Sequence, residues 1–207
     1  NERKTKMKNL KISVFTRTAL LTAVIFVLSF TPIGYLKVGP FDITFLTIPV
    51  IIGAITTGPS VGAFLGAIFG LTSFMQAVGG ASPLGSVLFS INPFFSAILC
   101  FIPRILMGWL CGLLYRGLNR KGNDSVVSVC IASISGALMN TLFFMSAFLL
   151  FFGNTEYVLN MRGGVNVFAF LTAMVGVNGV VEAVSCAVIG TAISKPLLKV
   201  LKKGNEA

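Results

Sequence analysis

Four polar side chains lie deep inside apolar stretches of this sequence, where a membrane-spanning helix offers them no water. They are Arg104, Asn140, Asn178 and Glu182. Placing an arginine at the centre of a membrane helix costs from roughly 3 to more than 10 kcal/mol, so such a residue normally faces a partner, a cavity or a ligand. Asn178 and Glu182 are four residues apart and therefore share one helix face. These residue types are suited to recognition, with a cation for an anionic group and amides and a carboxylate for hydroxyl and amide groups.

Two interpretations of this set stay open, and they do not exclude each other. In the first, Arg104 pairs with Glu182 and the two asparagines bond across helices to hold a bundle together. In the second, the four residues line a pocket that opens outward and binds a polar or anionic small molecule, because ionisable residues inside a membrane mark functional sites. Depth along the expected helices places all four at about the same level of the membrane.

Further candidates lie at the outer ends of the expected helices. Gln76 and Asn92 flank an uncharged connection over 79–91 that is rich in Gly and Ser, and its length makes it a candidate binding loop. Phe94 and Phe144 are candidate walls of a pocket. The alternatives are interfacial solvation for the two amides and packing or lipid contact for the two aromatic rings.

Several kinds of chemistry are excluded by what the sequence does not contain. It has no His, and its four Cys are scattered singly, without the paired spacing of a zinc or redox site. It contains no Walker A sequence, nucleophile motif or acidic metal cluster. We therefore expect neither an enzyme nor a metal site, and no cofactor in this chain. Any use of ATP falls to partner subunits.

The composition predicts an all-α membrane protein. Of its 207 residues, 55% are hydrophobic and 11% are charged, whereas soluble domains contain about 25% charged residues. At about 20 residues per crossing, the chain has room for six transmembrane helices in one integral membrane domain, 1–207, and no separate soluble domain. The formal charge of +10 does not indicate nucleic acid, because Lys and Arg lie at the ends of the expected helices.

The expected helices are separated by Gly, Pro and polar stretches at 32–42, 79–91 and 153–166. The segment over 43–57 contains Pro49 and is marginal for a full span. Gly62, Gly66 and Gly70 form a ridge on which another helix can pack closely. The six helices are expected over 10–30, 43–57, 61–78, 93–116, 125–152 and 167–193, with a basic C-terminal tail over 194–207.

The distribution of Lys and Arg predicts the topology. Twelve of the 16 lie at the N-terminus, between the fourth and fifth helices, or in the C-terminal tail, and only Lys37 and Arg162 lie in the connections on the other side. The positive-inside rule then puts both termini in the cytoplasm of a multi-pass protein of the cell membrane. The first apolar run is too long for a signal peptide and reads as a retained helix.

Three segments resemble a known family. They are IPVIIGAITTGPSVGAFLGAIFGLTSF at Ile48–Phe74, NPFF at Asn92–Phe95 and FIPRILMGWLCGLLY at Phe101–Tyr115. These segments resemble the substrate-binding S-components of energy-coupling factor (ECF) vitamin transporters, in particular the pantothenate-type branch. The resemblance covers the first four helices well and the last two in general character.

The resemblance implies six helices that bind a vitamin near the outer face, under loops 1–2, 3–4 and 5–6. It also implies a docking face for a transmembrane coupling (T) subunit, here Ala19 and Ala23, with Phe15 and Val27 at the flanking positions. Two ATPase subunits complete such complexes. We expect pantothenate to be bound, with Arg104 opposing its carboxylate.

Three alternatives remain at this point. The first is an S-component for another vitamin, such as riboflavin or a pyrimidine precursor, which requires more aromatic stacking. The second is an intramembrane enzyme that uses Glu182 as an acid or base. The third is a structural membrane protein in which Arg104 and Glu182 are only an ion pair.

Overall fold

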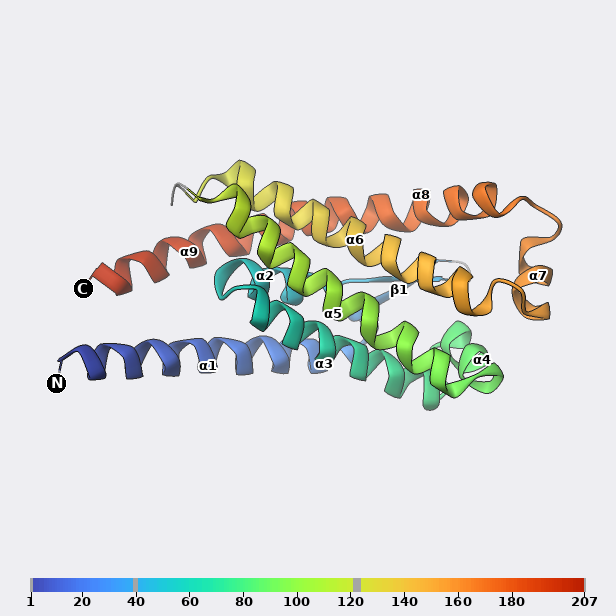
Figure 1. The fold of residues 1–207 in the computed structure, drawn as a ribbon, viewed down its shortest axis with the longest axis horizontal. Helices are drawn as coiled ribbons and strands as arrows, with labels where there is room; N and C mark the ends of the chain where they lie inside the picture. Colours follow the sequence, from blue (N-terminus) through green and yellow to red (C-terminus); the bar gives the residue numbers. More distant parts are fainter. Residues whose placement is uncertain (1, 39–40, 121–123, 207) are drawn as a thin grey trace.

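The protein is a bundle of helices with one small hairpin (Figure 1). The computed structural model describes residues 2–38, 41–120 and 124–206. A 3₁₀ turn at Pro32–Gly34 precedes the hairpin, and a π-helical turn at Cys186–Gly190 joins the last two helices. The strands are β1 (Tyr35–Val38) and β2 (Phe41–Thr44). The helices are α1 (Glu2–Ser29), α2 (Thr47–Thr56), α3 (Pro59–Val78), α4 (Pro83–Ile91), α5 (Pro93–Leu118), α6 (Val126–Phe152), α7 (Glu156–Arg162), α8 (Val167–Ser185) and α9 (Thr191–Glu206).

Five helical segments are long and apolar enough to cross a membrane. They are Ile12–Ser29, Pro59–Val78, Pro93–Leu118, Val126–Phe152 and Gly179–Lys202. The expectation of a helical membrane protein is confirmed, but the expected all-α class is corrected by the short hairpin of β1 and β2. The expected helix over 43–57 is different, because α2 has only ten residues and Phe41–Thr44 forms a strand. The stretches expected to be loops hold the hairpin, α4 and α7, and the tail continues the last helix as α9.

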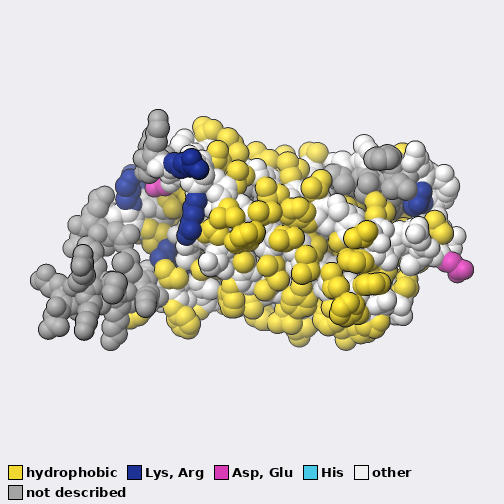
Figure 2. Space-filling view, viewed as in Figure 1, with side chains coloured by type: hydrophobic (Ala, Val, Ile, Leu, Met, Phe, Trp, Pro, Cys, Tyr) yellow, Lys and Arg dark blue, Asp and Glu magenta, His cyan; other side chains and the backbone are white. Residues whose placement is uncertain are grey.

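The long helices run along the long axis of the molecule (Figure 1). Both termini lie at one end of the bundle, and α4 and α7 lie at the opposite end. Figure 2 shows hydrophobic side chains over the middle of the visible face, with Lys and Arg concentrated toward the end that holds the termini. This banded surface is what a bilayer requires of a spanning protein.

Helix α2 lies at the centre of the fold. Every residue from Thr47 to Ile55 is buried, which is typical of a helix that is apolar on all sides. Its side chains join one core cluster with residues of α1, α3, α5, α6 and α8, including Ile25, Leu65, Met107 and Val129. The half-length helix therefore stays out of contact with lipid.

Helices α3 and α5 approach so closely that only glycine fits between them. A Cβ atom on Gly66 would lie 2.2 Å from the backbone oxygen of Arg104, and one on Gly62 would lie 2.3 Å from that of Gly108. The predicted glycine ridge is confirmed, and α5 is its partner. This seam fixes the backbone of α5 at the position of Arg104.

The π-helical turn sets the rotation of the last helix. Four buried residues, Glu182, Cys186, Gly190 and Ser194, follow one another at intervals of four. In a regular α-helix a row with this spacing rotates by about 40° at each step, because four residues exceed one turn of 3.6. The π-helical turn over Cys186–Gly190 takes up the extra rotation, so that Glu182 and Ser194 both face inward.

Candidate functional site

A cavity of about 120 Å³ lies between the hairpin and helices α3, α4, α5, α6 and α8. A single buried water needs only about 10–15 Å³ on the same measure, so this space is far larger than a packing defect. Its apolar lining includes Phe69, Leu99 and Phe144. Its polar lining consists of Tyr35, Thr44, Ser73, Gln76, Ser82, Ser96, Arg104, Asn140, Thr141 and Glu182.

Arg104 is held in place by a defect in its own helix. Pro103 lies inside α5 and has no N–H, so the carbonyl of Leu99, four residues earlier, loses its helical partner. The Nη1 atom of Arg104 donates to that carbonyl at 2.5 Å. The Pro103-Arg104 pair thus creates an open acceptor and supplies the donor that satisfies it, which fixes the direction of the guanidinium group.

Two aromatic rings flank the same guanidinium. Its carbon lies 5.3 Å from the centre of the Phe69 ring and 4.6 Å from that of Phe144, within the range of cation–π attraction. The Nε atom is buried and has no hydrogen-bond partner among the described residues. Arg104 therefore keeps unused donor capacity at the cavity.

Glu182 is satisfied by three donors from other helices. Oε1 accepts from the hydroxyl of Thr47 and, at 3.2 Å, from Nδ2 of Asn140, and Oε2 accepts from the hydroxyl of Thr141 at 3.3 Å. Thr47 is the first residue of α2, so the carboxylate also lies at the positive end of a helix dipole. Its side chain is only 5% exposed. A buried carboxylate needs compensation of this kind.

The ion pair that the sequence left open, between Arg104 and Glu182, is not formed. In the described part of the chain these two side chains share no salt bridge, and each is bound to other groups. The physical reason is that Glu182 already accepts hydrogen bonds from the side chains of Thr47, Asn140 and Thr141 and lies at the start of α2. No described carboxylate forms an ion pair with Arg104.

The structure brings together five of the eight residues predicted to bind a substrate. These five line the cavity: Gln76, Arg104, Asn140, Phe144 and Glu182. Gln76 also donates through Nε2 to the backbone oxygen of Ser29 at 2.6 Å, which ties the end of α3 to α1.

Three of the eight residues are not among those that line the cavity. Asn92 caps α5 by accepting from the N–H of Phe95 at 3.1 Å. Phe94 is 70% exposed on the outside of α5. The position of Asn178 lies in α8, but its side chain falls outside the described residues.

Sequence reasoning missed Thr47, Thr141, Phe69 and Tyr35. Thr141 and Phe69 are ordinary residues of apolar helices, and nothing in their local sequence marks them. Thr47 lies in the segment expected to be marginal for a full span, and a polar residue near the start of such a segment is a usable signal. Tyr35 begins a run of β-forming residues separated from a second run by the two residues Gly39-Pro40, a spacing typical of a hairpin.

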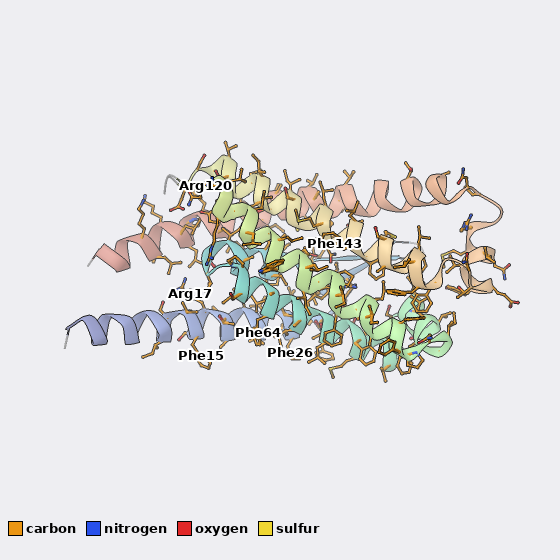
Figure 3. The ribbon with its side chains drawn as sticks, viewed as in Figure 1. Phe15, Arg17, Phe26, Phe64, Arg120 and Phe143 are labelled. Carbon is orange, nitrogen blue, oxygen red and sulfur yellow. The ribbon has the colours of Figure 1, made fainter. Side chains whose placement is uncertain are left out.

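A second hollow lies on the outside of α1. This groove of about 890 Å³ is almost wholly apolar, and the residues that line it include the small residues Ala19 and Ala23. In Figure 3 the labelled Phe15 and Phe26 lie on α1 at the edge of the molecule, and Phe64 of α3 is labelled between them. The groove is lined by Val14, Phe15, Thr18, Ala19, Thr22, Ala23, Phe26 and Phe64.

The fold and the two hollows define a multi-pass helical membrane protein with an internal polar binding cavity. The sequence matches the family described as "ECF transporter, substrate-specific component" over residues 13–194. The chain belongs to this family, whose members are transporter components and not enzymes.

Two relatives cover nearly the whole chain. It is 32% identical over 204 residues to the pantothenic acid transporter PanT of Lactococcus lactis subsp. cremoris, a match that covers 93% of this chain and 97% of that protein. It is 30% identical over 203 residues to the pantothenate transporter PanT of Leuconostoc mesenteroides subsp. mesenteroides, with 96% of each chain covered.

Proposed function

We propose that this chain is the substrate-binding subunit of an ECF-type importer and that its substrate is pantothenate. The observation that carries the proposal is the state of Arg104, a partly buried cation that lines the cavity and forms no ion pair with any described carboxylate. A carboxylate ligand supplies the missing charge. The names of the two PanT relatives support the same substrate.

In this proposal each part of the cavity meets one part of the vitamin. The guanidinium of Arg104 binds the carboxylate through charge-assisted hydrogen bonds, which are the strong ones. Gln76, Asn140, Glu182 and, from its position one turn away, Asn178 are the candidates for hydroxyl and amide groups, and Phe144 forms an apolar wall. Asn92 and Phe94 are left out because they do not line the cavity.

Calorimetric titration of the purified protein tests the substrate. Pantothenate, riboflavin and a pyrimidine precursor are titrated into the native protein, into Arg104→Gln and into the control Arg120→Gln. Arg120 is exposed beyond the end of α5. Removing one partner of a buried charge pair costs about 3–5 kcal/mol. We therefore expect Arg104→Gln to weaken pantothenate binding by at least a hundredfold and Arg120→Gln to leave it unchanged.

Three results would count against the proposal. If another vitamin binds and pantothenate does not, the architecture stands with a different substrate. If pantothenate binds equally well to folded Arg104→Gln, Arg104 does not hold the carboxylate. If no ligand binds to the native protein, the structural alternative gains and the transport function is lost.

The topology we propose has both termini in the cytoplasm and six membrane segments, with the β1–β2 hairpin and α2 together forming one incomplete span. Non-helical backbone is tolerated at membrane depth where it is buried or lines a cavity, and Tyr35 and Thr44 of the hairpin do line it. Accessibility of single introduced cysteines from either side of the membrane, in a background without native Cys, tests this arrangement.

The groove on α1 is the proposed docking site for a transmembrane coupling subunit, which itself works with two ATPase subunits. Small residues such as Ala19 and Ala23 allow another helix to approach closely. We expect Ala19→Trp to abolish pantothenate uptake in cells while leaving binding by the isolated protein unchanged. The matched control is Leu20→Trp, since Leu20 is 64% exposed on the same helix but is not part of the groove. Normal uptake by Ala19→Trp would refute this docking site.

A further inference from the structure

Hydrogen-bond acceptors remain open at the inner end of the cavity. A carboxylate has about four lone-pair sites, and Glu182 uses three of them for Thr47, Asn140 and Thr141. The second site on Oε2 is left. The hydroxyl hydrogen of Thr47 is directed to this carboxylate, and that of Thr141 has two acceptors at 3.3 Å, Oε2 of Glu182 and the backbone oxygen of Ala137, so neither threonine offers a donor to a ligand.

Asn140 adds a second open acceptor. Because a carboxylate can only accept, the atom of the Asn140 amide that faces Glu182 has to be the nitrogen, which fixes the orientation of the amide. Its oxygen, Oδ1, is then buried without a partner among the described side chains, on a residue that is 5% exposed and lines the cavity. A buried carbonyl without a donor is a costly group.

The wall of the cavity at Arg104 offers hydrogen-bond donors instead of acceptors. Arg104 offers only donors, and one of them is bound to the carbonyl of Leu99. The cavity therefore has a donor wall at Arg104 and an acceptor wall at Asn140 and Glu182. A ligand satisfies both walls only if it carries an anionic acceptor at one place and hydrogen-bond donors at another.

We infer that Asn140 is a specificity-determining residue that accepts a hydrogen bond from a ligand hydroxyl, and that Glu182 is the positioning residue that keeps its amide oxygen available. This inference rests on the proposed function and extends it from the carboxylate to the other end of the ligand. The substrate class becomes a small monocarboxylate with hydroxyl donors remote from the carboxylate, which pantothenate satisfies with two hydroxyls and an amide N–H.

The discrimination follows from the cost of a missing donor. A ligand that lacks the hydroxyl leaves Asn140 Oδ1 buried and unpaired, and sites built to bind a hydroxyl strongly reject analogues without it. An apolar side chain at position 140 removes both the requirement and the discrimination. An amide at position 182 can present either an acceptor or a donor, so the orientation of Asn140 is no longer fixed.

The test compares pantothenate with its two monodeoxy analogues, each of which lacks one hydroxyl and keeps the carboxylate. Their affinities are measured by calorimetry on the native protein, Asn140→Leu, Glu182→Gln and the control Arg120→Gln. We expect the native protein and the control to bind at least one deoxy analogue ten times or more weakly than pantothenate. In Asn140→Leu and Glu182→Gln, the affinities for pantothenate and for this deoxy analogue are expected to differ by less than threefold.

The outcomes separate this inference from the proposed function. If the native protein binds pantothenate and both deoxy analogues equally well, the inference is overturned while the proposed function stands; this comparison needs no variant to fold. A tenfold ratio that persists in folded Asn140→Leu also overturns it. If the native protein does not bind pantothenate at all, the proposed function itself has failed.

Discussion

Replacing Pro103 by alanine separates the stability of α5 from the orientation of Arg104. In the native protein Pro103 leaves the carbonyl of Leu99 without its helical donor, and Arg104 fills that place at 2.5 Å. Alanine restores a backbone N–H at position 103, which then competes for the same carbonyl. The guanidinium loses its fixed partner, although its charge and its helix remain.

Pro103→Ala is expected to raise the stability of the protein and to weaken its binding of pantothenate. A proline in a helix interior costs about 3 kcal/mol relative to alanine, so the substitution removes this cost. Losing the two buried ring carbons destabilises the variant by about 1.6 kcal/mol. The net effect is a gain of about 1 kcal/mol in stability. An arginine side chain that has to be ordered anew on binding loses up to about 2 kcal/mol of rotamer entropy. Pantothenate affinity is therefore expected to fall by up to roughly 30-fold.

Thermal unfolding in detergent and calorimetric titration measure the two effects on one sample. Pro196→Ala is the matched control, because Pro196 also lies inside a helix, α9, but away from the cavity. We expect the control to gain stability without any change in affinity. Unchanged affinity in Pro103→Ala would refute the idea that the Leu99 carbonyl orients Arg104, and a clear loss of stability would refute the account of the helix defect.

Two further predictions concern the packing around the site. Gly66→Ala should lower the free energy of unfolding by more than about 2 kcal/mol, because its Cβ would lie 2.2 Å from the backbone oxygen of Arg104. The control Gly117→Ala, with no atom within 4 Å, should stabilise the helix by about 0.5–1 kcal/mol. Equal shifts of the thermal midpoint in the two variants would contradict the close packing of α3 against α5. Thr47→Val should destabilise the protein by about 1–3 kcal/mol, because Glu182 loses one of its three donors; an unchanged midpoint in Thr47→Val would show that this bond contributes little.

Local patterns in the sequence predicted much of the fold. The apolar runs placed the long helices, and the interval of four between Gly62, Gly66 and Gly70 predicted a packing face, because both features depend only on residues close in the chain. The hairpin was not predicted, although the β-forming runs on either side of Gly39-Pro40 are a local signal. The Pro and Gly residues within 32–42 by themselves favour a loop, and the β-forming residues between them favour strands.

The candidate site was predicted in part. Intramembrane polarity was enough to single out Arg104, Asn140 and Glu182, which the structure brings to one cavity. Which group each of these side chains binds was not predicted from the sequence. The contact between Thr47 and Glu182 depends on α2 beginning inside the bundle. The choice between Glu182 and another group for Arg104 depends on contacts between residues 78 positions apart in the chain. Such pairings are set by tertiary packing and not by local pattern.

The inner limit of the cavity has a consequence for how cargo moves. The lining stops at Glu182 and Thr141, and beyond them the side chains of Ile51, Met107, Cys111, Val129 and Cys186 are packed into the main core. Among the described residues the pocket ends at this packed core, so a bound vitamin finds no passage through that part of the bundle. The vitamin then enters and leaves through the same opening of the pocket. The role of the proposed partner subunits is then to change the side of the membrane that this opening faces, and not to create a second opening.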